Sequence, residues 1–139
     1  MTHGTNMLRV FDASAVVEIF AGNRFLVEIL DQMHAGFLVA ALPVNAMAEA
    51  QAVLKARASH WAPVLAIFGL HTIPVTDDNA LEIGMIASPR IEYHPVHKAL
   101  IGPLMAVQVI HEAKVMNGVI VTSVPEAYRG HDVAILTIR

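Results

Sequence analysis

Short apolar runs alternate with helix-like repeats along the whole chain. Several of these runs are rich in branched and aromatic residues, which is typical of buried strands. The run that contains Pro74 is expected at a sheet edge, since proline is poorly placed in a central strand. The predicted strands are 8–11, 37–39, 72–75, 119–122 and 133–138.

Between these runs, apolar residues recur at spacings of three and four positions, which is typical of amphipathic helices. In the segment Arg24–His34, for example, one apolar face is formed by Phe25, Leu26, Ile29, Leu30 and Met33. Pro43 stands near the first turn of another helix, where its missing N–H has no cost. The predicted helices are 14–21, 24–34, 43–58, 61–69, 77–87 and 97–116, the last with a kink near Gly102-Pro103.

A loop is expected over Ser88–Val96, which contains two prolines. The regular alternation of strands and helices predicts an α/β fold with a mainly parallel sheet of four to five strands in a three-layer α/β/α arrangement. With 139 residues, the chain is expected to form one domain over positions 1–139.

The composition is unusually apolar, with 55% hydrophobic residues and a mean hydropathy of +0.55. No window predicts a membrane span, because Pro43, Asn45, Glu49 and Gln51 interrupt the longest apolar stretch. A parallel sheet covered on both faces, or an apolar dimer face, accounts for the surplus, and we expect a homodimer. The first residues do not resemble a secretory signal, so a cytoplasmic location is expected.

Cysteine and charge usage narrow the function classes. The absence of cysteine excludes disulfides and thiolate zinc sites. The net charge of −3, with nine lysines and arginines, does not favour an extended nucleic-acid interface. A small, local contact with RNA stays open.

Asp12 is the first candidate for chemistry, because it ends the predicted strand 8–11 and directly precedes a helix. Open α/β sheets place functional groups at the carboxyl ends of their strands, and a carboxylate there suits a hard divalent cation. It can equally accept hydrogen bonds from the first N–H groups of the helix. Glu49 lies among small apolar residues and is either solvated or compensated by another group.

Three segments, Val10–Val17, Leu42–Ala50 and Gly118–Ser123, together resemble the PIN-domain family, with VapC-type toxins of bacterial toxin–antitoxin pairs as the nearest relatives. The resemblance covers almost the whole chain. It implies a metal-dependent ribonuclease in which three or four acids hold magnesium or manganese at the carboxyl end of the sheet. It assigns the first and second acids, as catalytic and metal-binding residues, to Asp12 and Glu49, and it implies an antitoxin-like protein partner.

The chain departs from the family pattern at the third and fourth acids. The best alignment of the third position falls on Ala106, and Val124 stands where the family carries the aspartate of a Thr-x-Asp-Pro motif. Two carboxylates and water hold magnesium or manganese only weakly unless substrate phosphates contribute. We therefore expect either no metal cofactor or a weakly bound one.

Three hypotheses follow from these residues. The first is a PIN-like protein with a weakened or lost ribonuclease site and a binding or regulatory role. The second is an active magnesium- or manganese-dependent ribonuclease, the toxin of a toxin–antitoxin pair, which uses a reduced acidic site. The third is a structural or dimerising subunit without nucleic-acid contact.

The eight histidines of the chain are a second group of candidate functional residues. His94, His97 and His111 could suggest a transition-metal site, but Pro95 disfavours helical geometry between the first two. We interpret His94 and His97 as loop and helix-cap residues, and His111 as a helix-face or interface residue.

Overall fold

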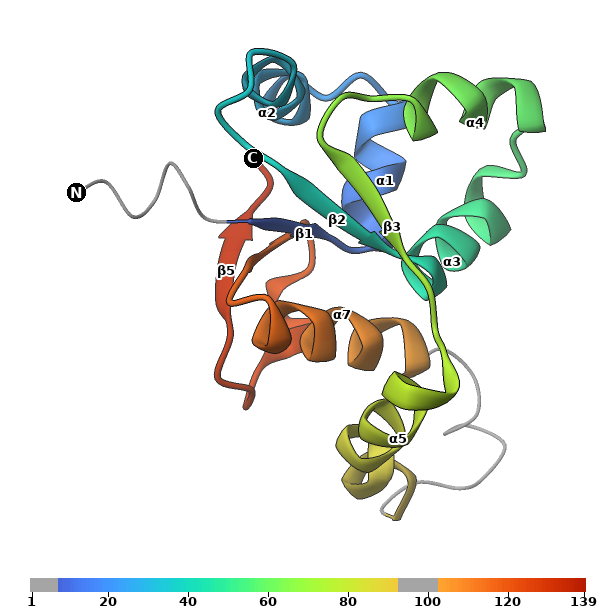
Figure 1. Cartoon of the computed structure of the whole chain (residues 1–139), viewed down its shortest axis with the longest axis vertical. Coiled ribbons are helices and arrows are strands. Elements are labelled where there is room, and N and C mark those ends of the chain that lie inside the picture. The colour runs from blue at the N-terminus through green and yellow to red at the C-terminus, as the bar shows by residue number, and fades with distance from the viewer. Residues whose placement is uncertain (1–7, 93–102) are drawn as a thin grey trace.

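The computed structural model describes residues 8–92 and 103–139. Within these residues the chain forms a five-stranded sheet with the order β3-β2-β1-β4-β5, and every neighbouring pair is parallel (Figure 1). The predicted mainly parallel sheet is therefore confirmed. The strands are β1 (Arg9–Phe11), β2 (Ala40–Pro43), β3 (Leu70–Ile73), β4 (Val119–Thr122) and β5 (Ala134–Thr137).

Helices cover both faces of this sheet, which confirms the predicted three-layer α/β/α fold. Figure 1 shows α1 and α2 on one side and α7 on the other, with α5 further out against α7. The helices are α1 (Ala13–Phe20), α2 (Arg24–His34), α3 (Val44–Leu54), α4 (Ala58–Leu65), α5 (Asp77–Glu92) and α7 (Pro103–Val115), and a short 3₁₀ helix, η2 (Pro125–Tyr128), follows β4.

The central strands supply much of the core. Val10 and Phe11 of β1 and Ile120 and Val121 of β4 are fully buried. A parallel sheet covered on both faces needs such continuous apolar strands, and this accounts for part of the high hydropathy. Among the described residues, no helix has the length and apolar character that crossing a membrane requires.

The predicted strand at 37–39 is wrong, since β2 begins only at Ala40. The preceding residues still close α2: Gly36 has φ +87°, and the N–H of Phe37 donates to the carbonyl of Gln32 at 2.9 Å. This is a Schellman motif, which satisfies the last carbonyls of the helix. The prediction took the aromatic residue Phe37 as a sign of a buried strand, but its side chain is 70% exposed.

The predicted helices at 43–58 and 61–69 are shifted in the structure. Pro43 ends β2 and precedes α3, which stops at Leu54 because Lys55 adopts a left-handed conformation. The following turn is held by Gln51, whose side chain bonds both backbone groups of Ala56 and accepts from Trp61 Nε1 at 2.7 Å. These bonds let α4 begin earlier than the apolar pattern predicts.

The expected loop over Ser88–Val96 is wrong in its first part, because α5 continues to Glu92. Ile83 and Ala87 of α5 pack against Val107 of α7. The remainder of that loop, the predicted start of the last helix with its kink, and His94 and His97 lie outside the described residues.

Gly118, the residue before β4, lies where the chain closely approaches the beginning of β1. A Cβ atom there would lie 2.9 Å from Val10 Cγ2 and 3.1 Å from the Leu8 carbonyl oxygen. Gly118→Ala is therefore expected to lower the free energy of unfolding by about 1–3 kcal/mol in urea denaturation. Gly84→Ala is the control: its Cβ meets nothing within 4 Å. That change is expected to stabilise α5 by about 0.5–1 kcal/mol, and equal effects of the two changes would contradict the close approach.

Candidate functional site

Asp12 lies at the carboxyl end of β1, where the sequence placed it, and its side chain is fully buried. It caps α1: Oδ1 accepts from the Ala15 N–H at 3.0 Å and from the Ser14 hydroxyl at 2.6 Å. The other oxygen, Oδ2, accepts from the Tyr128 hydroxyl at 2.8 Å. Both oxygens of the carboxylate therefore have donors from within the protein.

A second layer of hydrogen bonds surrounds the Asp12 carboxylate. The Ser14 hydroxyl oxygen accepts from the Ser123 N–H at 2.9 Å and lies 3.2 Å from Thr122 Oγ1. Thr122 is fully buried at the end of β4, and its hydroxyl accepts from the Val124 N–H at 2.9 Å. The start of α1, the end of β4 and η2 are thus joined around one carboxylate.

Glu49, on α3, is half-buried and lies within electrostatic range of Asp12. Burial raises the pKa of the Glu49 carboxyl, and the negative charge of Asp12 raises it further. The folded state therefore favours the neutral form of Glu49 more than the unfolded state does, so this group lowers the stability of the fold as the pH rises above its unfolded pKa. The structure thus brings together the two acids that the resemblance selected.

The positions of the third and fourth acids offer no side-chain oxygen. Ala106 is a core residue with 6% exposure, and Val124 stands before η2 with 38% exposure. No group of three or more potential ligands from His, Cys, Asp and Glu occurs in the described part of the chain. Magnesium and manganese require several oxygen ligands, so two carboxylates, one of which already accepts three hydrogen bonds, fit such an ion poorly.

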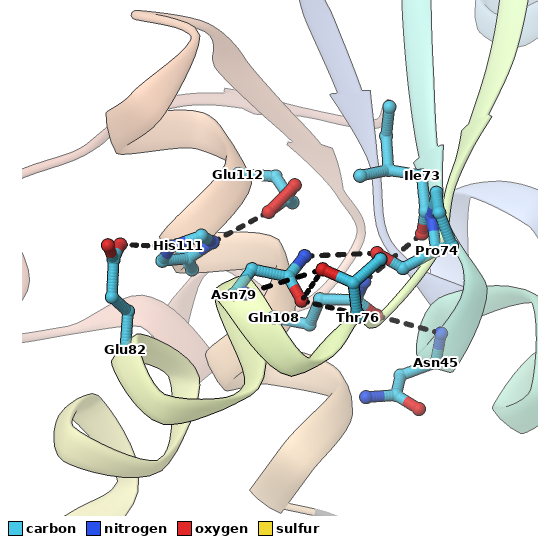
Figure 2. Close-up of polar contacts among 9 residues, drawn as sticks. All are labelled: Asn45, Ile73, Pro74, Thr76, Asn79, Glu82, Gln108, His111 and Glu112. Carbon is cyan, nitrogen blue, oxygen red and sulfur yellow. Dashed lines mark hydrogen bonds and ion pairs between the residues drawn. The ribbon is translucent and has the colours of Figure 1, made fainter.

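Gln108 is a buried polar residue that the sequence reasoning missed. It is fully buried on α7, its Oε1 accepts from the Asn45 N–H at 2.9 Å, and its Nε2 donates to the Ile73 carbonyl at 3.1 Å (Figure 2). One amide therefore satisfies the start of α3 and the end of β3. The available signal was a polar residue within the apolar stretch Ala106–Ile110.

His111 lies at the contact between α5 and α7, buried between two carboxylates (Figure 2). Its Nδ1 is 2.6 Å from Glu112 Oε1 and its Nε2 is 2.7 Å from Glu82 Oε2. Burial alone would lower the pKa of His111, but the hydrogen bonds and charges of Glu82 and Glu112 together raise it above 6.5. The two short contacts fit an imidazolium that donates from both nitrogens.

The fold is similar to those of solved toxin–antitoxin proteins. VapBC2 from Rickettsia felis, bound to a DNA fragment from its promoter, matches with a TM-score of 0.67 and 19% identity over 96% of this chain and 100% of that chain. A toxin–antitoxin complex from Klebsiella pneumoniae matches with a TM-score of 0.59 and 14% identity over 94% and 98% of the two chains.

The structure of FitAB bound to an IR36 DNA fragment matches with a TM-score of 0.56 and 14% identity over 93% of this chain and 94% of that chain. At these identities the likeness shows a common fold. No protein-family model matches the chain, and no curated protein matches it in sequence.

Two variants test the structural role of the Asp12 carboxylate. Asp12→Ala removes the α1 cap, and Tyr128→Phe removes one donor to a buried charge. Each is expected to lower the free energy of unfolding by about 1–3 kcal/mol, measured by chemical denaturation without added metal. If the Asp12 carboxylate served only as a metal ligand, its removal would instead raise the free energy of unfolding, because the repulsion with Glu49 would be relieved. Unchanged or increased stability in both variants would refute the structural role.

The His111 cluster predicts a stability that depends on pH. The raised pKa of folded His111 means that the folded state binds more protons than the unfolded state above pH 6.5. The contribution is therefore complete below 6.5 and is lost as pH rises through the folded pKa. At pH 6, His111→Gln should lower the free energy of unfolding by about 1–3 kcal/mol, and the difference should shrink with rising pH.

Glu82→Gln provides the matched control for this pH series. The Glu82 side chain is 67% exposed, so this variant removes the weaker of the two carboxylate contacts and should show a smaller loss. A difference between wild type and His111→Gln that stays constant from pH 6 to alkaline pH would contradict the imidazolium assignment.

Proposed function

We propose that this protein is a PIN-like binding module, related to VapC-type toxins, whose metal-dependent ribonuclease site is weakened or lost. The observation that carries the proposal is the Asp12 carboxylate, whose two oxygens both accept hydrogen bonds from within the protein. A carboxylate that serves as a metal ligand must direct lone pairs at the ion, and the donors around Asp12 compete for those lone pairs.

The replaced acids support the same proposal on electrostatic grounds. Several carboxylates in one site repel one another and depend on a cation for compensation. With Ala106 and Val124 in place, only the repulsion between Asp12 and Glu49 is left, and the amide and hydroxyl donors compensate the buried charge of Asp12. The local fold is then stable without a metal.

The proposed partner is an antitoxin-like protein, because the solved structures with this fold include toxin–antitoxin complexes. An apolar groove of about 520 Å³ between α3 and α4 is the surface on which we place it. Met47, Trp61 and Leu65 line this groove, together with Gln51. Such a groove suits the apolar face of an amphipathic helix from the partner.

One observation favours the rival function, an active magnesium- or manganese-dependent ribonuclease. Asp12 and Glu49 lie close enough to raise the pKa of Glu49, and a bound cation would relieve that repulsion. RNA phosphates could add the oxygen ligands that the chain lacks. The two functions therefore differ in whether a metal binds at all.

Calorimetric titration with manganese separates the two functions. The binding module is expected to give no binding heat at millimolar manganese and no manganese-dependent cleavage of RNA. Glu49→Gln and Asp12→Asn serve as paired controls, and Glu49→Gln leaves the α1 cap in place. Cleavage that requires manganese and disappears in both variants would establish the ribonuclease instead.

A further inference from the structure

Helix α5 is attached to the rest of the protein through a small contact with α7. Figure 1 shows it beside α7 and away from the sheet. The apolar part of the contact is the cluster of Ile83 and Ala87 with Val107, which is separate from the main core. Leu81 and Met85 of α5 are exposed and contribute little buried area. A helix with so few buried apolar contacts depends on its polar contacts to stay in place.

A buried histidine of α7, His111, makes the polar part of this contact (Figure 2). Its Nε2 lies 2.7 Å from Oε2 of Glu82 on α5, and its Nδ1 lies 2.6 Å from Oε1 of Glu112 on α7 itself. Among the described residues, these two carboxylates are the charges that act on the imidazole, and Lys114 lines the hollow beside them. One ring nitrogen therefore links the two helices, and the other one bonds within α7.

The two carboxylates differ in their access to water, and this decides which contact needs the second proton of His111. The side chain of Glu112 is 6% exposed, whereas that of Glu82 is 67% exposed. A neutral imidazole has one N–H, and it stays on Nδ1, because water compensates Glu82 but does not reach Glu112. Nε2 then presents a lone pair to Glu82, and two acceptors at that distance repel each other. Loss of one proton thus breaks the contact between the helices and spares the one within α7.

We propose that His111 is a proton-dependent switch, which holds α5 on α7 when the imidazole is charged and releases α5 when it is neutral. The pivot is the segment between β3 and α5. There Asn79 Nδ2 donates to the Pro74 carbonyl at 3.0 Å, and Asn79 Oδ1 accepts from the Thr76 N–H at 2.6 Å (Figure 2). These bonds do not involve α7, so they persist when α5 moves away. Release uncovers Val107 and the inner face of α5, while the sheet stays folded.

The direction of the switch follows from proton linkage. Glu82 and Glu112 outweigh the effect of burial and raise the pKa of His111. Because the contact with Glu82 requires a proton on Nε2, the attached state binds this proton more tightly than the detached state. Attachment is therefore complete below the pKa of the detached state and is lost as the pH rises through the pKa of the attached state. Between these two values, the equilibrium for opening rises by up to about tenfold per pH unit.

Thiol labelling measures this local opening, because the chain has no cysteine of its own. Ala87→Cys places one thiol between α5 and α7, and Ala50→Cys on α3 is the matched control, since both alanines are fully buried. The labelling rate is measured from pH 6 to pH 9 and divided by the rate of the same chain in denaturant, which removes the effect of thiol ionisation. We expect the ratio to rise at least about tenfold for Ala87→Cys. It should stay constant for Ala50→Cys.

Two substitutions of Glu82, each combined with Ala87→Cys, separate a switch from a merely structural contact. In Glu82→Gln, the amide accepts from a charged imidazole and donates to a neutral one, so labelling should stay slow at every pH. In Glu82→Ala, the contact is absent in both states, so labelling should be fast at every pH. Asp78→Asn is the control on the first turn of α5, and it should keep the pH dependence of the unsubstituted helix.

Hydrogen–deuterium exchange of the unsubstituted chain gives the same information without a new thiol. Peptides from α5 should lose protection as the pH rises, after correction for the intrinsic exchange rate, while peptides from β4 keep theirs. A labelling ratio at Ala87→Cys that does not change with pH, together with constant protection of α5, would overturn the proposal. So would a pH dependence that persists in Glu82→Gln. A parallel rise at Ala87→Cys and Ala50→Cys would show unfolding of the whole domain instead of release of α5.

Discussion

The buried carboxylate of Asp12 is the constraint around which the carboxyl edge of the sheet is arranged. A fully buried charge has a large desolvation cost unless several donors compensate it. Here the donors come from α1 and from η2, which follows β4, so the compensation requires all of these segments to be in place at once. The sheet supplies most of the apolar burial, whereas this one charge fixes how three segments meet at its edge.

Helix α7 carries two further buried polar groups, and both have hydrogen-bond partners on neighbouring segments or on α7 itself. The amide of Gln108 satisfies backbone groups of α3 and β3, and His111 stands between Glu82 and Glu112 where α5 packs on α7. Apolar contacts are non-directional, so they bring these elements together without fixing their register. The buried polar groups add directional bonds, which allow few alternative arrangements.

The same physics connects the fold with the proposed function. In the site that the PIN-like resemblance implies, a metal would compensate several acids, whereas in this structure hydrogen bonds from within the protein compensate the Asp12 carboxylate. Asp12 therefore contributes to the structure whether or not chemistry remains at the site. Neither Asp12 nor Glu49 is among the residues that line the apolar groove between α3 and α4.

The sequence by itself determined the order of strands and helices, the parallel sheet and the place of Asp12, because periodicity and the position of a residue after a strand are local properties. The start of β2 at Ala40 and the end of α3 at Leu54 were missed, since they depend on the Schellman motif that follows α2 and on the left-handed conformation of Lys55. Only the tertiary structure decided that Tyr128 completes the donors around Asp12, because that bond joins residues 116 positions apart.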